Sequence, residues 1–113
     1  MYHYKIKRIN RIIDGDTVDL DIDVGFWVTV SYRVRLFGID APETRTKDLE
    51  EKKKGLEAKE WLEKELSQEG NWFIQTHKED KYGRILGVLY RAEDVQSLND
   101  KMIMEGYADK YLP

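Results

Sequence analysis

The stretch RVRLFGIDAPETR, residues 33–45, decides how this sequence is interpreted. Its first part alternates charged and apolar residues, which is the pattern of a half-buried β-strand. Ala41-Pro42 then ends the strand, because proline has no backbone N–H to donate. Two acids, Asp40 and Glu43, flank the proline. A strand that carries arginines therefore runs directly into a stiff, acidic loop.

Two further strands are predicted before this segment. Residues 4–13 form a strand pattern that ends at Asp14-Gly15, a strong turn dipeptide. Residues 17–24, TVDLDIDV, alternate strictly between polar and apolar side chains, which indicates a second strand with one buried face. The third strand is expected over residues 26–39, because good strand formers continue through most of that range.

The second half of the chain predicts a helix, a hairpin and a short helix. Apolar residues recur at helical spacing over 48–68. Residues 71–78 and 84–91 form two strand patterns joined by the turn EDKYG, and residues 97–106 indicate the last helix. The order β-β-β-α-β-β-α is that of an OB-fold, a five-stranded barrel of the α+β class. We expect residues 1–113 to form a single domain.

The composition limits the class of protein and the kinds of metal site. With 41% hydrophobic and 36% charged residues, the chain suits a soluble globule rather than a disordered protein. It has no cysteine, so a metal would be held by oxygen atoms or by His3 and His77. No run approaches membrane-spanning length, and no signal peptide opens the chain. We therefore expect a cytoplasmic monomer without membrane contact, or a secreted protein if this sequence is a trimmed part of a longer one.

Three carboxylates lie at the ends of predicted strands. Asp16 shares the parity of the apolar residues in the second strand, so its side chain is expected to point toward the apolar face. The plainer interpretation of Asp16 is a turn acid that accepts hydrogen bonds from backbone amides. Together with Asp40 and Glu43 it gives an all-oxygen set that suits a hard cation such as Ca²⁺. No EF-hand spacing is present, so the prediction of a calcium site rests on these three carboxylates alone.

Arg35 and Arg84 lie on or beside predicted strands, where their directions are fixed. A guanidinium stays charged, and its planar fork matches the oxygens of a phosphate. The alternative is that each arginine pairs with one of the 22 acidic residues. The net charge of −3 and the pI of about 5.4 argue against a strongly basic nucleic-acid binder. The local runs KIKR and EKKKG still allow a basic patch.

Three motifs in this order, IIDGDTV, VRLFGIDAPET and DKYGR, resemble the staphylococcal nuclease-like (thermonuclease) family. The resemblance runs from about residue 6 to residue 108. It implies an OB-fold barrel and Ca²⁺-dependent hydrolysis of DNA and RNA phosphodiester bonds that leaves 3′-phosphate ends. Nucleic acid is the partner that it implies. The alternative is a nuclease-like OB module that binds nucleic acid or protein without cutting, although degenerate members lose metal acids or an arginine that this chain retains.

The resemblance also implies roles for the acidic loop. Asp16 and Asp40 match two calcium-ligand aspartates, and Ala41 matches a position that contributes its backbone carbonyl. Glu43 matches the acid assigned as general base for the attacking water. The charged groups would then converge on one phosphate.

For the cationic residues, the resemblance implies phosphate binding. Arg35 and Arg84 match the two phosphate-binding arginines, and Lys81 and Tyr82 match positions near the phosphate of a bound nucleotide. For the tyrosine that stacks on the nucleotide in relatives, Tyr111 is the candidate.

Overall fold

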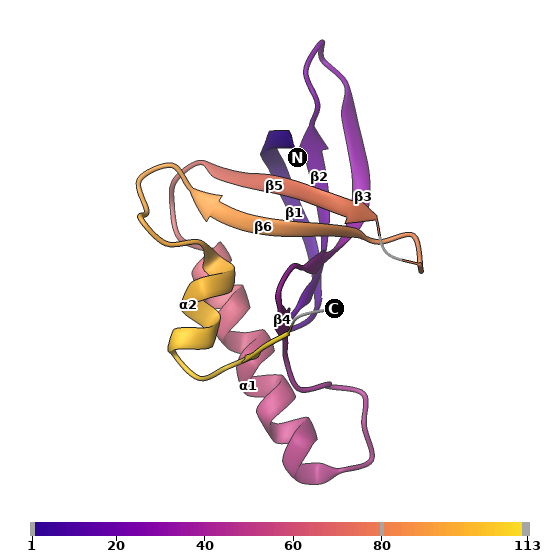
Figure 1. Cartoon of the computed structure of the whole chain (residues 1–113), viewed down its shortest axis with the longest axis vertical. Helices are drawn as coiled ribbons and strands as arrows, with labels where there is room; N and C mark the ends of the chain where they lie inside the picture. The colour runs from indigo at the N-terminus through magenta and orange to yellow at the C-terminus, as the bar shows by residue number, and fades with distance from the viewer. Residues whose placement is uncertain (1, 80, 112–113) are drawn as a thin grey trace.

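The structure, a computed structural model, describes residues 2–79 and 81–111, apart from the side chain of Glu79. It confirms the predicted OB-fold, a closed five-stranded barrel with strand order β1-β2-β3-β6-β5 (Figure 1). The barrel strands are β1 Tyr2–Asp14, β2 Thr17–Asp23, β3 Thr29–Leu36, β5 Trp72–Glu79 and β6 Ile85–Arg91. Neighbouring strands are antiparallel except for β3 and β6, whose parallel pairing closes the barrel.

Two helices lie at the same end of the barrel, below the β5–β6 ribbon in Figure 1. Helix α1, Leu49–Leu66, begins at the predicted place because the Asp48 carboxylate accepts hydrogen bonds from the first-turn N–H groups. Helix α2, Leu98–Met104, is capped in the same way by Ser97. Leu98 and Met102 are buried, so α2 covers the end of the barrel as its sequence pattern indicates.

The core is filled by alternate residues of the strands. Val18, Leu20 and Ile22 of β2 are buried, and so are Val34 and Leu36 of β3. The predicted apolar face of α1 packs against them through Ala58, Trp61, Leu62 and Leu66. Each such large aliphatic side chain contributes about 1.5–3 kcal/mol when fully removed from water.

The third strand is shorter than predicted at its start. Residues 26–28 are not strand, because Gly25, Phe26 and Trp27 form a tight turn with φ of 90°, 54° and 62°. The N–H of Val28 donates to the Gly25 carbonyl at 2.9 Å and closes this turn. A left-handed conformation costs about 1–2 kcal/mol for each non-glycine residue. Phe26 and Trp27 are strand-forming residues, so the sequence did not predict a turn at these positions. The resulting β2–β3 hairpin projects beyond the barrel (Figure 1).

The third strand is also shorter than predicted at its end. It stops at Leu36, since Gly38 turns the chain with a φ of 80°. The next residues form β4, Ile39–Asp40, which pairs with β7, Asp109–Lys110, in a small second sheet that the sequence analysis did not predict. The N–H of Tyr111 donates to the Gly38 carbonyl at 2.9 Å. The segment after α2 is therefore held against the loop that follows β3.

The other elements begin and end within a few residues of their predicted bounds. A glycine just beyond the predicted helix, Gly70, was expected to cap its C-terminus, but the cap is Ser67 and Gly70 lies in the following turn with a φ of 131°. Asp80 of the predicted hairpin turn lies outside the described residues. In the described part of the chain, no helix has both the length and the apolar character needed to cross a membrane.

Candidate functional site

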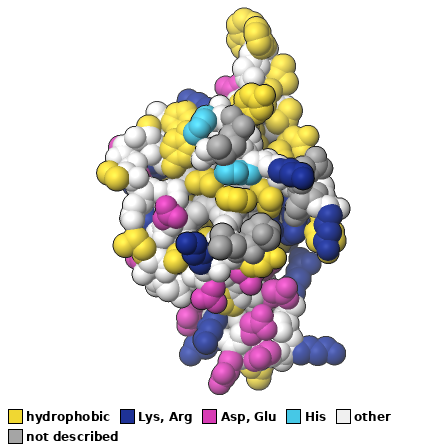
Figure 2. Space-filling model, in the orientation of Figure 1, with side chains coloured by type: hydrophobic (Ala, Val, Ile, Leu, Met, Phe, Trp, Pro, Cys, Tyr) yellow, Lys and Arg dark blue, Asp and Glu magenta, His cyan; other side chains and the backbone are white. Residues whose placement is uncertain are grey.

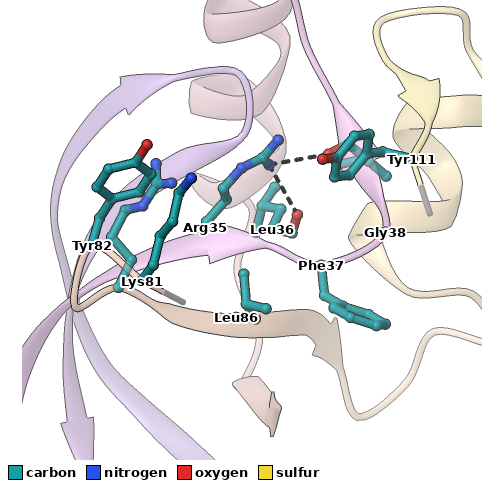
Figure 3. A pocket seen from close by; sticks show the side chains of 10 residues that line it. Arg35, Leu36, Phe37, Gly38, Lys81, Tyr82, Leu86 and Tyr111 are labelled. Carbon is teal, nitrogen blue, oxygen red and sulfur yellow. Dashed lines mark hydrogen bonds between the residues drawn. The ribbon is translucent and has the colours of Figure 1, made fainter. Parts of the chain in front are cut away.

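A solvent-open pocket lies between the end of β3 and the turn that joins β5 to β6 (Figure 3). Arg35 enters it from β3, and Lys81, Tyr82 and Arg84 enter it from the turn. The parallel pairing of Arg35 with Leu86 brings these two segments together. The structure thus assembles both predicted arginines in one place. Three cationic side chains around one pocket favour an anionic ligand.

The exposed ring of Tyr82 organises the cations of the turn. The Lys81 ammonium lies 5.2 Å from its centroid, and the Arg84 guanidinium carbon lies 5.3 Å from it. Both distances are within the range of a cation–π contact. Across the pocket, the guanidinium carbon of Arg35 lies 5.8 Å from the ring centroid of Tyr111. Tyr111 is therefore a lining residue of the pocket, on the side of Arg35.

Arg35 is fixed by backbone carbonyls and connects the pocket to the acids. Its side chain is only 17% exposed. The guanidinium donates to the Ile39 carbonyl at 3.1 Å. It also lies 3.6 Å from Oδ2 of Asp16 and 3.5 Å from Oδ1 of Asp40. One guanidinium therefore contacts both aspartates that the resemblance assigns to calcium.

Asp16, which directly precedes β2, is buried, as its shared parity with the apolar residues of that strand predicted. Its Oδ1 accepts from the Thr17 hydroxyl at 3.0 Å, and its Oδ2 accepts from the Ala41 N–H at 3.0 Å. Asp16 thus accepts a hydrogen bond from a backbone amide, as expected of a turn acid. The amide, however, belongs to the acidic loop, which is distant in sequence, and not to the turn itself. An ionised carboxylate has about four lone-pair positions, so these two bonds leave capacity for a cation.

The donor chemistry around Asp16 and Asp40 fits a hard cation. The Asp40 side chain is 62% exposed and open to a ligand. The adjacent Ala41 is buried, and its carbonyl is an oxygen donor of the kind that Ca²⁺ accepts. Among residues 2–79 and 81–111, no three His, Asp or Glu side chains are grouped closely enough to hold a metal. Carbonyl and water oxygens would have to complete the shell.

Glu43 lies beside the pocket rather than in its lining. It is exposed in a neighbouring groove, where Asp40 and Ala41 also lie, together with acids of α1 such as Glu50 and Glu51. Asp40 contacts Arg35, so the groove and the pocket are adjacent. The predicted general base is therefore near the predicted metal residues but separated from the cationic cluster.

Two residues that position the Glu43 loop were missed in the sequence analysis. The Asp14 carboxylate accepts hydrogen bonds from both the N–H and the hydroxyl of Thr44. Gly55 of α1 lets the loop approach the helix, because a Cβ there would lie 2.4 Å from the Glu43 carbonyl oxygen. A glycine inside a helical pattern was the available signal for such a close approach.

The comparisons with known proteins identify the family. A model described as staphylococcal nuclease homologue matches residues 33–112. The chain belongs to the staphylococcal nuclease family. This confirms the resemblance carried by the three motifs, two of which, VRLFGIDAPET and DKYGR, lie entirely within the matched range.

Two of the individual relatives are thermonucleases, which agrees with this assignment. A thermonuclease of Staphylococcus intermedius is 33% identical over 101 residues, which cover 88% of this chain and 56% of that protein. A thermonuclease of Staphylococcus hyicus is 28% identical over 102 residues, which cover 89% of this chain and 56% of that protein. Protein ParB of Escherichia coli is 32% identical over 111 residues, which cover 92% of this chain and 56% of that protein. The chain thus spans about half the length of these relatives.

Proposed function

We propose that this protein is a Ca²⁺-dependent nuclease that hydrolyses phosphodiester bonds of DNA, RNA or both. One observation carries the proposal: Arg35 contacts Asp16 and Asp40 while it lines the same pocket as Arg84. Groups suited to phosphate therefore lie next to oxygen donors suited to a metal. The two thermonucleases among the relatives support the same activity.

In this mechanism the arginines bind the scissile phosphate. Water attacks phosphorus, the bond to the 5′ oxygen breaks, and the phosphate stays on the 3′ side. Negative charge builds on the phosphoryl oxygens during attack, so fixed cations stabilise the transition state more than the bound substrate. Arg35 is preorganised for this role because the Ile39 carbonyl holds its guanidinium in place. Arg84 acts from the opposite wall of the pocket, and Lys81 adds positive charge beside it.

The acidic loop would supply the metal ligands and the base. Asp16, Asp40 and the Ala41 carbonyl would hold Ca²⁺, which when bound would neutralise charge on the phosphate. Glu43 would accept a proton from the attacking water. Asp14 holds the loop through Thr44, and this anchor keeps Glu43 close to Asp40.

A second candidate is a nuclease-like module that binds nucleic acid without cutting it. The position of Glu43 in the acidic groove, outside the lining of the cationic pocket, favours this candidate. Its pocket would still bind a phosphate backbone, because the three cations do not depend on the base.

Cleavage of a labelled single-stranded DNA separates the two functions. We expect degradation with Ca²⁺, none with a chelator, and products that carry 3′-phosphate groups, which a phosphatase can remove. Arg35→Ala should abolish cleavage, whereas Arg8→Ala should not, since Arg8 lies on the surface of β1 and pairs with Asp21 at 3.3 Å. Binding of the DNA without any cleavage in Ca²⁺ would support the non-catalytic module instead.

A further inference from the structure

The tip of the β2–β3 hairpin displays large apolar side chains to solvent. Phe26 is 91% exposed and Trp27 is 100% exposed, and Val28 and Tyr32 beside them are also exposed. Figure 2 shows these hydrophobic side chains gathered along the hairpin at the top of the view. Phe26 and Trp27 also hold positive φ angles, which bulky side chains rarely adopt. Exposed, strained aromatics contribute little to the fold, so they indicate a surface that another molecule covers.

The same hairpin carries an open strand edge. Strand β3 pairs with β2 from Thr29 to Arg35, but its pairing with β6 begins only at Val34. In the described part of the chain, no strand pairs with the outer side of residues 29–33. An edge of this kind offers backbone donors and acceptors to an added strand.

The direction of the ladder bonds shows which groups the edge presents. The N–H of Val24 donates to the Val28 carbonyl, and the N–H of Leu36 donates to the Asp16 carbonyl. Even-numbered residues of β3 therefore turn their backbone groups toward β2, and odd-numbered residues turn theirs outward. Thr29, Ser31 and Arg33 thus present N–H and C=O groups along the free edge.

The sequence led us to expect a monomer, but we propose that this open edge is the interface of a homodimer, in which β3 of two copies pairs antiparallel about a two-fold axis at Ser31. This register joins Ser31 to its own copy and Thr29 of each chain to Arg33 of the other. All three positions have outward backbone groups, so each pair can exchange both hydrogen bonds. The intervening pairs set Val30 of one copy beside Tyr32 of the other, a favourable combination of β-branched and aromatic side chains. No like charges face each other.

Two further observations support a second copy as the occupant. Natural edge strands are usually protected by lysine, proline or a bulge, but residues 29–33 contain neither lysine nor proline. Their one charged side chain, Arg33, is turned to Asp19 of β2, with a 2.8 Å hydrogen bond. Beyond the shared ladder, Phe26 and Trp27 extend toward the partner's β6. A stable interface buries about 800 Å² on each partner. An aromatic side chain buries about 150–250 Å², so Phe26, Trp27 and Tyr32 together would supply much of that area.

A disulfide trap tests the register directly, because the chain has no cysteine. The paired Cα atoms at position 31 would lie about 5.5 Å apart, within the range that a disulfide spans. Mild oxidation of Ser31→Cys should therefore give a covalent dimer. Thr29→Cys is the matched control, since two copies of position 29 would be offset by about 13 Å along the strands and should not be linked. Equal linking of both variants, or of neither, would overturn the proposal.

Sedimentation velocity of the unmodified chain gives an independent measurement. We expect a monomer–dimer equilibrium that Thr29→Lys weakens by repelling Arg33 of the partner and that Thr29→Glu strengthens.

Tryptophan fluorescence gives a third measurement. Trp61 and Trp72 are buried, so the emission of the exposed Trp27 should shift to the blue as protein concentration rises. A chain that remains monomeric would overturn the dimer. So would a shift that appears only on adding anionic lipid vesicles or a single-stranded oligonucleotide. The inference does not depend on nuclease activity.

Discussion

The backbone N–H of Ala41 donates to Oδ2 of Asp16 at 3.0 Å, although the two residues are 25 positions apart. This bond fixes the acidic loop to the start of β2. Asp16 therefore has a structural task in addition to its proposed contact with calcium. Asp40, exposed on the same loop, has no comparable bond to a backbone amide in the described part of the chain. The two aspartates should be separable by mutation.

We expect Asp40→Ala to weaken Ca²⁺ binding with little change in stability, because the Asp40 side chain is 62% exposed. Asp16→Ala should weaken Ca²⁺ binding and also destabilise the fold by about 1–3 kcal/mol, since it leaves a buried N–H without an acceptor. Asp16→Asn retains an acceptor oxygen and should recover part of that stability without recovering Ca²⁺ binding. Calorimetric titration and thermal unfolding measure the two effects. Unchanged calcium affinity in Asp40→Ala would place the metal elsewhere.

The arginines should not tolerate exchange for lysine. Arg35→Lys and Arg84→Lys keep the charge but lose the planar fork that matches phosphate oxygens. Loss of one preorganised electrostatic donor typically lowers kcat on the order of 10²–10³-fold. Single-turnover assays on a DNA oligonucleotide measure this loss, and Arg8→Lys on the surface of β1 serves as the matched control. Near-normal turnover in both pocket variants would remove the arginines from the mechanism.

The barrel could be predicted because its strands follow local rules. Alternation in residues 17–24 identified β2 and the face that it buries, and parity placed Asp16 on that face before any contact was known. Arg35 and Arg84 could be assigned to one pocket through the family motifs, and the parallel pairing of β3 with β6 provides the physical reason for their proximity.

Features that depend on distant contacts or on unfavourable local conformations were not predictable. The turn at Phe26 and Trp27 opposes the backbone preferences of both residues. The pairing of β4 with β7 joins two-residue strands that carry too little sequence pattern to be recognised. The position of Glu43 depends on how α1 meets the acidic loop, which its local sequence does not encode.

That contact leads to a prediction for Gly55. In an open helix, Gly→Ala stabilises by about 0.5–1 kcal/mol. At Gly55 a Cβ would lie 2.4 Å from the Glu43 carbonyl oxygen, so the loop or the helix must shift. We expect Gly55→Ala to destabilise by about 1–3 kcal/mol and to reduce cleavage as Glu43 moves. Thermal unfolding and nuclease assays measure both effects, and Lys53→Ala, at an exposed position of the same helix, should change neither. A gain in stability at Gly55→Ala would show that the loop yields freely.

Asn99 of α2 is expected to be the most sensitive polar residue of the fold. It is 3% exposed, and its side chain accepts from the Leu89 N–H at 3.1 Å and donates to the Phe37 and Gly87 carbonyls at 2.8 and 3.1 Å. Asn99→Ala leaves these backbone groups without their side-chain partner, so we expect a loss of about 3 kcal/mol.

For a chain of this size, that loss should lower Tm by roughly 10–15 °C. Ser97→Ala, which removes only the half-buried cap of α2, should cost about 1 kcal/mol and provides the control beside the same helix. Asn99→Asp keeps the acceptor for Leu89 but loses the donor, and it should again be strongly destabilised. Since Phe37 lines the pocket, Asn99→Ala should also weaken nucleotide binding below its Tm, which fluorescence titration measures. If the Tm of Asn99→Ala is no lower than that of Ser97→Ala, the Asn99 amide does not hold α2 to the barrel. The proposed link between α2 and the pocket would then be wrong as well.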